Sequence, residues 1–185
     1  MRANLFSPVL QVFPCFDEPR LKATFTLKLG RAKEYRTRSN TAAKKEAQKI
    51  AHKPGFLWDI YKTTPKMSTY LLAWVVFKMK SAKSKSKRGV KFEAFHSNAS
   101  LMQHSADVGA KMLDYFEQKI FVGINYNLPK VDLVAVPRLK AWGMENWGMI
   151  TFQPVKLEYS EEKRNTETIR HDELLAHELV NSFPN

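Results

Sequence analysis

The spacing of apolar residues changes along the chain, and this change limits the fold to a mixture of strands and helices. In residues 21–29 apolar and polar side chains alternate without a break, which is typical of a half-buried strand. Residues 69–77 are rich in β-branched and aromatic side chains and predict a buried strand. A third strand is expected from Gly89, whereas residues 41–50 have a short helical pattern.

The second half of the chain alternates between helical and strand patterns. A helix with Ser97 or Asn98 as its N-cap is predicted from apolar or small residues at three- and four-residue steps, namely Leu101, Ser105, Val108, Met112, Phe116 and Ile120. Strands are predicted over residues 131–136 and 149–153. A last helix, capped by Asn165, has its apolar positions at Ile169, Leu175, Ala176, Leu179 and Val180.

The segment rich in serine and lysine at residues 81–88 is expected to be a linker or an exposed hairpin. It places a domain boundary between residues 1–88 and residues 89–185. The fold class expected from these elements is α+β.

Charge and composition exclude several classes of protein. The net charge is +12, but the basic stretches at residues 31–53 and 78–91 lack interleaved aromatic residues, so we expect solvated loops and no specific nucleic-acid partner. The longest apolar run, residues 70–77, is too short for a membrane span. The single cysteine, Cys15, excludes an internal disulfide framework and is expected to be a small buried residue or a free thiol.

The predicted last helix contains His177, Glu178 and Asn181. In a metallopeptidase helix, two histidines four residues apart lie on one face and bind one zinc ion, while the glutamate after the first histidine is the general base. The first histidine and the glutamate are present here, but Asn181 occupies the second histidine's position. Taken alone, a His-Glu pair on a helix carries little weight.

Several other segments occur with this pair in a fixed order. They are FPCFDEP at residues 13–19, PKMSTYL at 65–71, LDYFE at 113–117, LPKVDLVAVP at 128–137 and GMENWG at 143–148. From residue 13 to residue 185 the chain resembles the aminopeptidase N type of zinc metallopeptidase, the gluzincin aminopeptidase family. The resemblance implies that residues 1–88 are the later part of an all-β N-terminal domain. It also implies that residues 89–185 are the opening part of a thermolysin-like catalytic domain, ending in the zinc helix.

The same resemblance assigns a substrate-binding segment. The family's Gly-Ala-Met-Glu-Asn motif aligns with residues 142–146, in which Glu145 would pair with the free α-amino group of a peptide. Gly143, Met144 and Asn146 would complete this substrate-binding segment. Trp142 replaces the motif's first glycine, so its side chain is expected to obstruct or distort the site.

The resemblance also assigns the zinc site. His177 matches the first zinc ligand and Glu178 the general base, whereas Asn181 replaces the second ligand and the third lies beyond residue 185. An amide oxygen is a poor zinc ligand beside imidazole. Zinc is therefore implied by the family but is not expected to be retained by this chain.

Three hypotheses about function follow. In the first, the chain represents a zinc aminopeptidase, which removes N-terminal amino acids from peptides, either in truncated form or as a fragment of a longer active enzyme. The chain alone is expected to lack turnover because its zinc site is incomplete. Alternatively, it is a non-catalytic relative that binds peptides with a free N-terminus or a partner protein. In the third hypothesis the chain has no stable function, because the helix face of Leu175 and Leu179 lacks its partners and associates through exposed apolar surface.

The location is not fixed by these patterns. The family includes plasma-membrane and extracellular enzymes. The residues before Pro14 contain no recognisable signal or anchor, so a chain made as written is expected in the cytoplasm.

Overall fold

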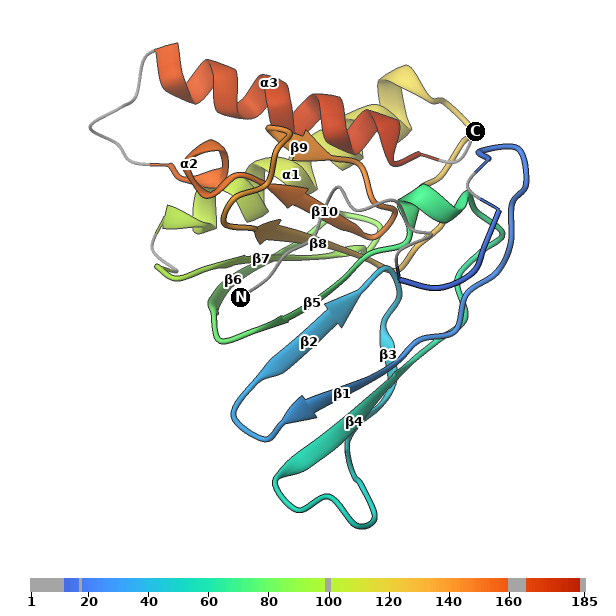
Figure 1. Ribbon diagram of the computed structural model, residues 1–185. Helices are drawn as coiled ribbons and strands as arrows, with labels where there is room; N and C mark the ends of the chain where they lie inside the picture. Colours follow the sequence, from blue (N-terminus) through green and yellow to red (C-terminus); the bar gives the residue numbers. More distant parts are fainter. Residues whose placement is uncertain (1–11, 17, 99–100, 160–165, 184–185) are drawn as a thin grey trace. The chain divides into compact units, whose positions relative to one another are not determined.

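The computed structural model describes residues 12–16, 18–98, 101–159 and 166–183 (Figure 1). The chain divides into two compact units, residues 1–78 and residues 79–185. Each unit has its own strands and its own buried apolar residues. We describe them separately.

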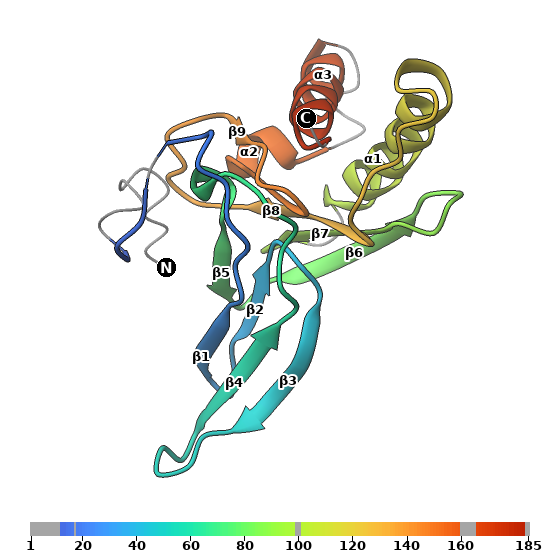
Figure 2. The ribbon, with the colours of Figure 1, turned by 90° about the vertical axis from the view of Figure 1, so that its right-hand side faces the viewer.

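The first unit is built from two small antiparallel sheets. The larger has the strand order β1 (Lys28–Ala32), β4 (Phe56–Tyr61) and β3 (Ala43–Lys49), and the smaller pairs β2 (Arg36–Ser39) with β5 (Trp74–Phe77). Figure 2 shows β4 between β1 and β3, the two strands with which it pairs. This unit is therefore a β structure, as expected.

The carboxylate of Asp59 on β4 joins the strands of the first unit. It accepts hydrogen bonds from Arg31 Nη2 on β1 at 3.2 Å, from Thr37 Oγ1 on β2 at 2.6 Å and from the backbone N–H of Ala47 on β3 at 2.8 Å. Burial acts to raise the pKa of Asp59, but these hydrogen bonds and the charge of Arg31 outweigh it and lower the pKa below its ordinary value.

Two of the predicted elements in this unit were wrong. Residues 41–50 were expected to be helical, but residues 43–49 form β3, which pairs with β4. Of the strand predicted at residues 21–29, only Lys28 and Leu29 lie in β1, and Ala23 forms a single bridge with Met67. Residues 69–77 contain a single 3-10 turn, Thr69–Leu71, before β5 begins.

The second unit is built on a mixed sheet of five strands. Their order is β6 (Lys80–Lys85), β7 (Lys91–His96), β8 (Lys130–Ala135), β10 (Met149–Phe152) and β9 (Gly143–Met144). The three central strands are parallel, and both edge strands are antiparallel to their neighbours. Every residue of β8 and β10 is buried, in keeping with their mostly apolar sequences, and the strands predicted at residues 131–136 and 149–153 are observed.

The serine- and lysine-rich segment is part of this unit. β6 pairs with β7 from Lys80 opposite His96 to Lys85 opposite Lys91, and the turn contains Gly89 at a φ of +95°. Of the two structures expected for residues 81–88, the hairpin is confirmed. The second unit therefore begins at residue 79, before β6, whereas the sequence placed the boundary after residue 88.

The helices of the second unit are α1 (Gln103–Tyr115), α2 (Pro154–Leu157) and α3 (Thr166–Asn181), and a π-helical turn at Phe116–Ile120 extends α1. Figure 2 shows α1 and α3 on the same side of the five-stranded sheet. The expected α+β fold is observed.

The helix predicted at residues 101–120 exists, but its buried face differs from the expected one. The buried residues include Gly109 and Ala110, and a Cβ at Gly109 would lie 3.0 Å from the ring of Phe92. Ile120 is exposed, and Met102 occupies the N-cap position expected for Ser97 or Asn98. Small residues let α1 approach the sheet closely, and a pattern of large apolar residues does not reveal that face.

The expectation of an unpartnered apolar face on the last helix was wrong. Leu175 and Leu179 have exposed fractions of 1% and 0%, whereas Ile169, expected on the same face, is 60% exposed. Phe183 is also buried and lies against the rings of Phe116, Phe121 and Tyr126. The predicted cap, Asn165, lies outside the described residues.

No helix within the described residues is both long enough and apolar enough to cross a lipid bilayer.

Candidate functional site

The predicted substrate segment and the predicted zinc helix meet at one edge of the five-stranded sheet. Gly143 and Met144 form β9, the edge strand, and α3 contacts this strand (Figure 1). A Cβ added to Gly143 would lie 2.6 Å from Cδ and 2.7 Å from Cγ of Glu178. A larger residue at position 143 would therefore displace the Glu178 side chain, which occupies that space.

The loop after β9 is fixed by buried polar groups. The backbone N–H of Gly148 donates to the hydroxyl of Tyr126 at 3.0 Å, and Gly148 O accepts a hydrogen bond from Lys130 Nζ at 2.7 Å. Lys130 in turn pairs with Asp132 at 2.7 Å. Asn146 is buried and its carbonyl oxygen accepts from the backbone N–H of Met149. The segment that carries Glu145 is thus held in one position.

Glu178 is a buried acid without a compensating donor. Its residue is 5% exposed, and among the described residues its Oε2 atom is the one buried side-chain polar atom with no hydrogen-bond partner. Burial raises the pKa of Glu178 to about 7, and the negative charge of Glu145 contributes in the same direction. The two carboxyl groups are therefore close enough to interact electrostatically, and a cation placed between them would relieve both effects.

The side chains of His177 and Asn181 form a hydrogen bond. The amide Nδ2 of Asn181 donates to Nε2 of His177 at 3.1 Å, and both residues are exposed. This hydrogen bond occupies the lone pair with which an imidazole would bind a metal ion. Among the described residues, the one group of three histidine or acidic donors that could hold a metal ion does not include His177. This part of α3 therefore presents one imidazole, and Asn181 offers an amide at the position of the motif's second histidine.

Trp142, expected to obstruct the substrate segment, has a largely exposed side chain. It is 65% exposed, and Nζ of Lys156 lies 4.6 Å from the ring centroid. The backbone carbonyl of Trp142 accepts a hydrogen bond from the N–H of Gln153 at 3.0 Å.

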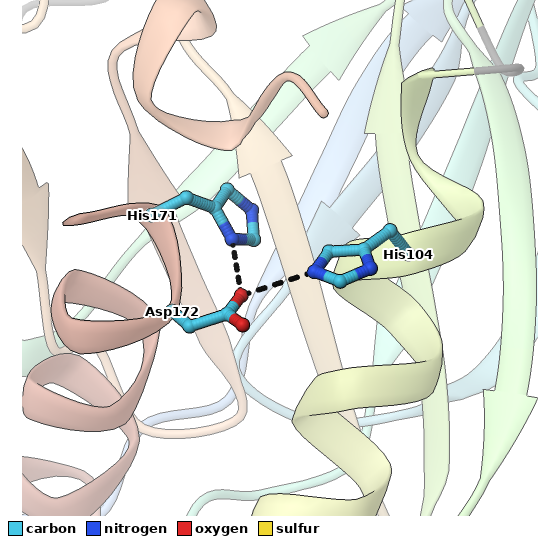
Figure 3. A group of neighbouring side chains, drawn as sticks. All are labelled: His104, His171 and Asp172. Carbon is cyan, nitrogen blue, oxygen red and sulfur yellow. Dashed lines mark hydrogen bonds and ion pairs between the residues drawn. The ribbon is translucent and has the colours of Figure 1, made fainter. Parts of the chain in front are cut away.

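A second group of functional side chains was not predicted. His104 on α1 and the adjacent residues His171 and Asp172 on α3 converge, and their ligand atoms all lie within 4.8 Å of one another (Figure 3). The only local signal in the sequence was the His-Asp pair at 171–172. His104 is far away in the sequence, so the contact depends on the packing of α1 against α3.

Comparison with protein families and individual proteins was consistent with the motif analysis. Residues 10–71 match the model of the peptidase M1 N-terminal domain, and residues 104–183 match the model of the peptidase family M1 domain.

Similar proteins include aminopeptidases from fungi and vertebrates. The chain is 39% identical to mitochondrial aminopeptidase 2 of Saccharomyces cerevisiae over 175 residues, which are 94% of the chain and 18% of that protein. It is 35% identical to endoplasmic reticulum aminopeptidase 2 of Bos taurus and to aminopeptidase A of Gloydius brevicauda, in each case over 92% of the chain and 18% of the relative. The chain thus spans about a fifth of the length of these relatives.

Proposed function

Because the chain belongs to the peptidase M1 family, we propose that it binds peptides by their free N-terminal amino group, at Glu145 and Glu178. Aminopeptidases of this family are zinc metallopeptidases that act on peptides. The part of such a site that selects a peptide terminus is chemically separable from the part that cleaves the peptide bond. We propose that this chain carries the first part and does not catalyse hydrolysis.

The observation that carries the proposal is the buried Glu178 carboxylate, whose Oε2 atom has no hydrogen-bond partner and whose pKa the charge of Glu145 helps to raise. An α-ammonium group has three N–H donors and a positive charge, so it would give Glu178 Oε2 a donor and offset the repulsion between the two acids. An internal peptide nitrogen has one N–H donor and no charge, and so does the amide nitrogen of an acetylated N-terminus. Such a pair of acids therefore favours free termini over blocked ones.

The absence of hydrolysis is proposed on the geometry of His177. A catalytic zinc ion needs three protein ligands and an open position for water. Nε2 of His177 accepts a hydrogen bond from Asn181, and an amide replaces the second imidazole. Peptide binding at Glu145 requires neither of these residues.

The proposal is tested by calorimetric titration with a short peptide in two forms, one with a free N-terminus and one N-acetylated. We expect the free form alone to bind, and Glu145→Gln to weaken it about 10- to 100-fold, the effect of losing one charge-assisted hydrogen bond. The matched control is Glu173→Gln, which removes an exposed acid from the same helix as Glu178. Equal binding of both peptides, or indifference to Glu145→Gln, would refute the proposal.

A zinc aminopeptidase is the alternative, and a second measurement distinguishes it. Release of the chromophore from an aminoacyl anilide is followed with added Zn²⁺. We expect no turnover above that of the Glu178→Gln variant. Zinc-dependent turnover that disappears in Glu178→Gln would show that the chain is a catalyst.

A further inference from the structure

The contact between α1 and α3 contains three metal-ligating side chains that have no part in the proposed peptide site. Nε2 of His104 lies 3.1 Å from Asp172 Oδ1, and Nδ1 of His171 lies 2.7 Å from the same oxygen. Figure 3 shows both imidazole rings directed at this carboxylate. Two histidines and one aspartate are a common set of ligands for zinc.

The hydrogen bonds around His171 leave a lone pair facing the carboxylate. Ser105 Oγ lies 2.9 Å from the carbonyl oxygen of Leu157 and 2.9 Å from His171 Nε2. A carbonyl oxygen can only accept, so the single hydroxyl hydrogen goes to Leu157, and Nε2 of His171 must donate to Ser105. In the neutral imidazole the proton is then on Nε2, and Nδ1 presents its lone pair to Asp172.

A lone pair facing a carboxylate oxygen at 2.7 Å is repulsive unless a proton or a metal cation lies between them. A divalent cation satisfies His104 Nε2, His171 Nδ1 and Asp172 Oδ1 with both imidazole rings neutral.

A second buried histidine shows the contrast. His96 accepts a hydrogen bond at Nδ1 from the backbone N–H of Asn98 at 3.0 Å, so its Nε2 carries the proton and donates to Glu158 at 3.0 Å. Both ring nitrogens of His96 are satisfied by a single neutral form of the ring. No single neutral form satisfies both ring nitrogens of His171.

Ser105, His171 and Asp172 are also connected as serine, histidine and aspartate are in a hydrolytic triad. The serine, however, does not fit the role of a nucleophile. Ser105 is completely buried, and its hydroxyl hydrogen is held by Leu157. A nucleophile must reach the substrate and give its proton to the histidine. Ser105 is instead a buried partner that fixes the orientation of the His171 ring.

We propose that His104 Nε2, His171 Nδ1 and Asp172 Oδ1 bind a zinc ion that links α1 to α3, separately from the family's zinc motif. At zinc bond lengths of about 2.0–2.2 Å, tetrahedral ligands lie about 3.3 Å apart. The ligand atoms here lie within 4.8 Å of one another, so their separations would change by at most about 1.5 Å, which side-chain rotation can supply. The exposed side-chain fractions of His104 and Asp172 are 23% and 30%, which leaves a path for the ion and for a water molecule as the fourth ligand. The buried Ser105 supplies the outer-shell hydrogen bond that orients a ligating histidine.

The test uses the full chain and Co²⁺, which replaces zinc and has visible absorption bands that report its coordination. We expect one Co²⁺ ion per chain with tetrahedral bands, displaced by Zn²⁺. His104→Phe removes the ligand atom but keeps a ring stacked on Tyr159, whose centroid lies 3.8 Å from that of His104. His104→Phe and Asp172→Asn should each weaken Co²⁺ binding at least 10-fold, because even outer-shell partners contribute about 10- to 100-fold.

The matched control is His177→Gln, which removes the histidine of the family motif from the same helix. It should leave the Co²⁺ bands unchanged. Circular dichroism and thermal unfolding verify that each variant is folded. His171 is left intact because its loss would remove a buried hydrogen bond to Ser105. No Co²⁺ binding by the unaltered chain would overturn the proposal, as would binding that persists in folded His104→Phe and Asp172→Asn.

Discussion

At the scale of single residues, the sequence motifs name residues that the structure places at the edge of the sheet, but not how these residues are arranged. The aligned motifs singled out Glu145, Glu178 and Gly143, and the structure brings Gly143 against Glu178. The orphaned Glu178 oxygen could not be predicted, because it results from packing between residues far apart in the chain. For the same reason His104, His171 and Asp172 were missed.

The close packing of Gly143 against Glu178 gives a prediction about stability. In Gly143→Ala the new methyl group would lie 2.6 Å from Glu178 Cδ, so the glutamate must move, and we expect the free energy of unfolding to fall by about 1–3 kcal/mol. Urea denaturation measures this change. The matched double variant Gly143→Ala with Glu178→Ala removes the obstructing side chain. Most of the loss should then be recovered as a coupling energy between the two sites, and strictly additive effects would contradict the contact.

The hydrogen bond between Asn181 and His177 gives a prediction about metal affinity. Asn181→His would place two imidazoles four residues apart on α3, where both can bind one ion. In the His104→Phe background, we expect zinc affinity to rise at least 10-fold, since even outer-shell partners contribute about 10- to 100-fold. A chromophoric zinc chelator measures the competition. Asn181→Ala is the control, because it frees His177 without adding a ligand; equal affinity in the two variants would contradict the prediction.

At the scale of elements, the errors in prediction have physical causes. Residues 43–49 contain alanine, lysine, glutamate and glutamine, which are good helix formers, yet they form β3 because β4 provides a pairing partner. Ala47 has a φ of +54°, and the register with β4 shifts around it. A helix does not accommodate that conformation, and its stabilising partner, Asp59, lies on another strand. The buried strand β8, in contrast, was predicted because its sequence is rich in β-branched and other apolar residues.

The Asp59 network joins four strands and gives a prediction about pH. Its folded-state pKa is lowered below 3.8, so the ionised form stabilises the fold above that value, and the stabilisation is lost as pH falls through the lower folded pKa. In Asp59→Asn the buried Arg31 loses its charge partner, and we expect the free energy of unfolding at pH 7 to fall by about 3–5 kcal/mol. Urea denaturation from pH 2 to pH 7 measures both effects.

The pH dependence separates this network from general acid effects. Stability of the Asp59→Asn variant should vary less with pH below 3.8 than that of the unaltered chain. The control Glu46→Gln removes an exposed carboxyl group from β3 and should leave the fall in unfolding free energy below pH 3.8 unchanged. If Asp59→Asn loses as much unfolding free energy at low pH as the unaltered chain, another group is responsible.

At the scale of the whole molecule, the second compact unit begins at residue 79, whereas local composition indicated a boundary at residue 88. Residues 81–88 have the lysine and serine content of a linker, but β6 is an edge strand, and edge strands are commonly exposed and charged. The family models match residues 10–71 and 104–183, so they leave the boundary between them open. The assignment of residues 1–88 and 89–185 to the two family domains stays a prediction, to be tested against the unit boundary at residue 79.

Two fragments distinguish these boundaries. A fragment of residues 79–185 keeps all five strands of its sheet, whereas residues 89–185 lack β6. Without β6, β7 loses its ladder from Lys91 to His96, the carboxylate of Glu93 loses the hydroxyl of Ser81, and α1 loses a strand that it contacts. We therefore expect a cooperative thermal transition and Co²⁺ binding for residues 79–185. For residues 89–185 we expect a broad transition and weaker Co²⁺ binding, because β6 supports the helix that carries His104. Equal cooperativity and equal binding in the two fragments would favour the boundary at residue 88 and show that β6 is dispensable.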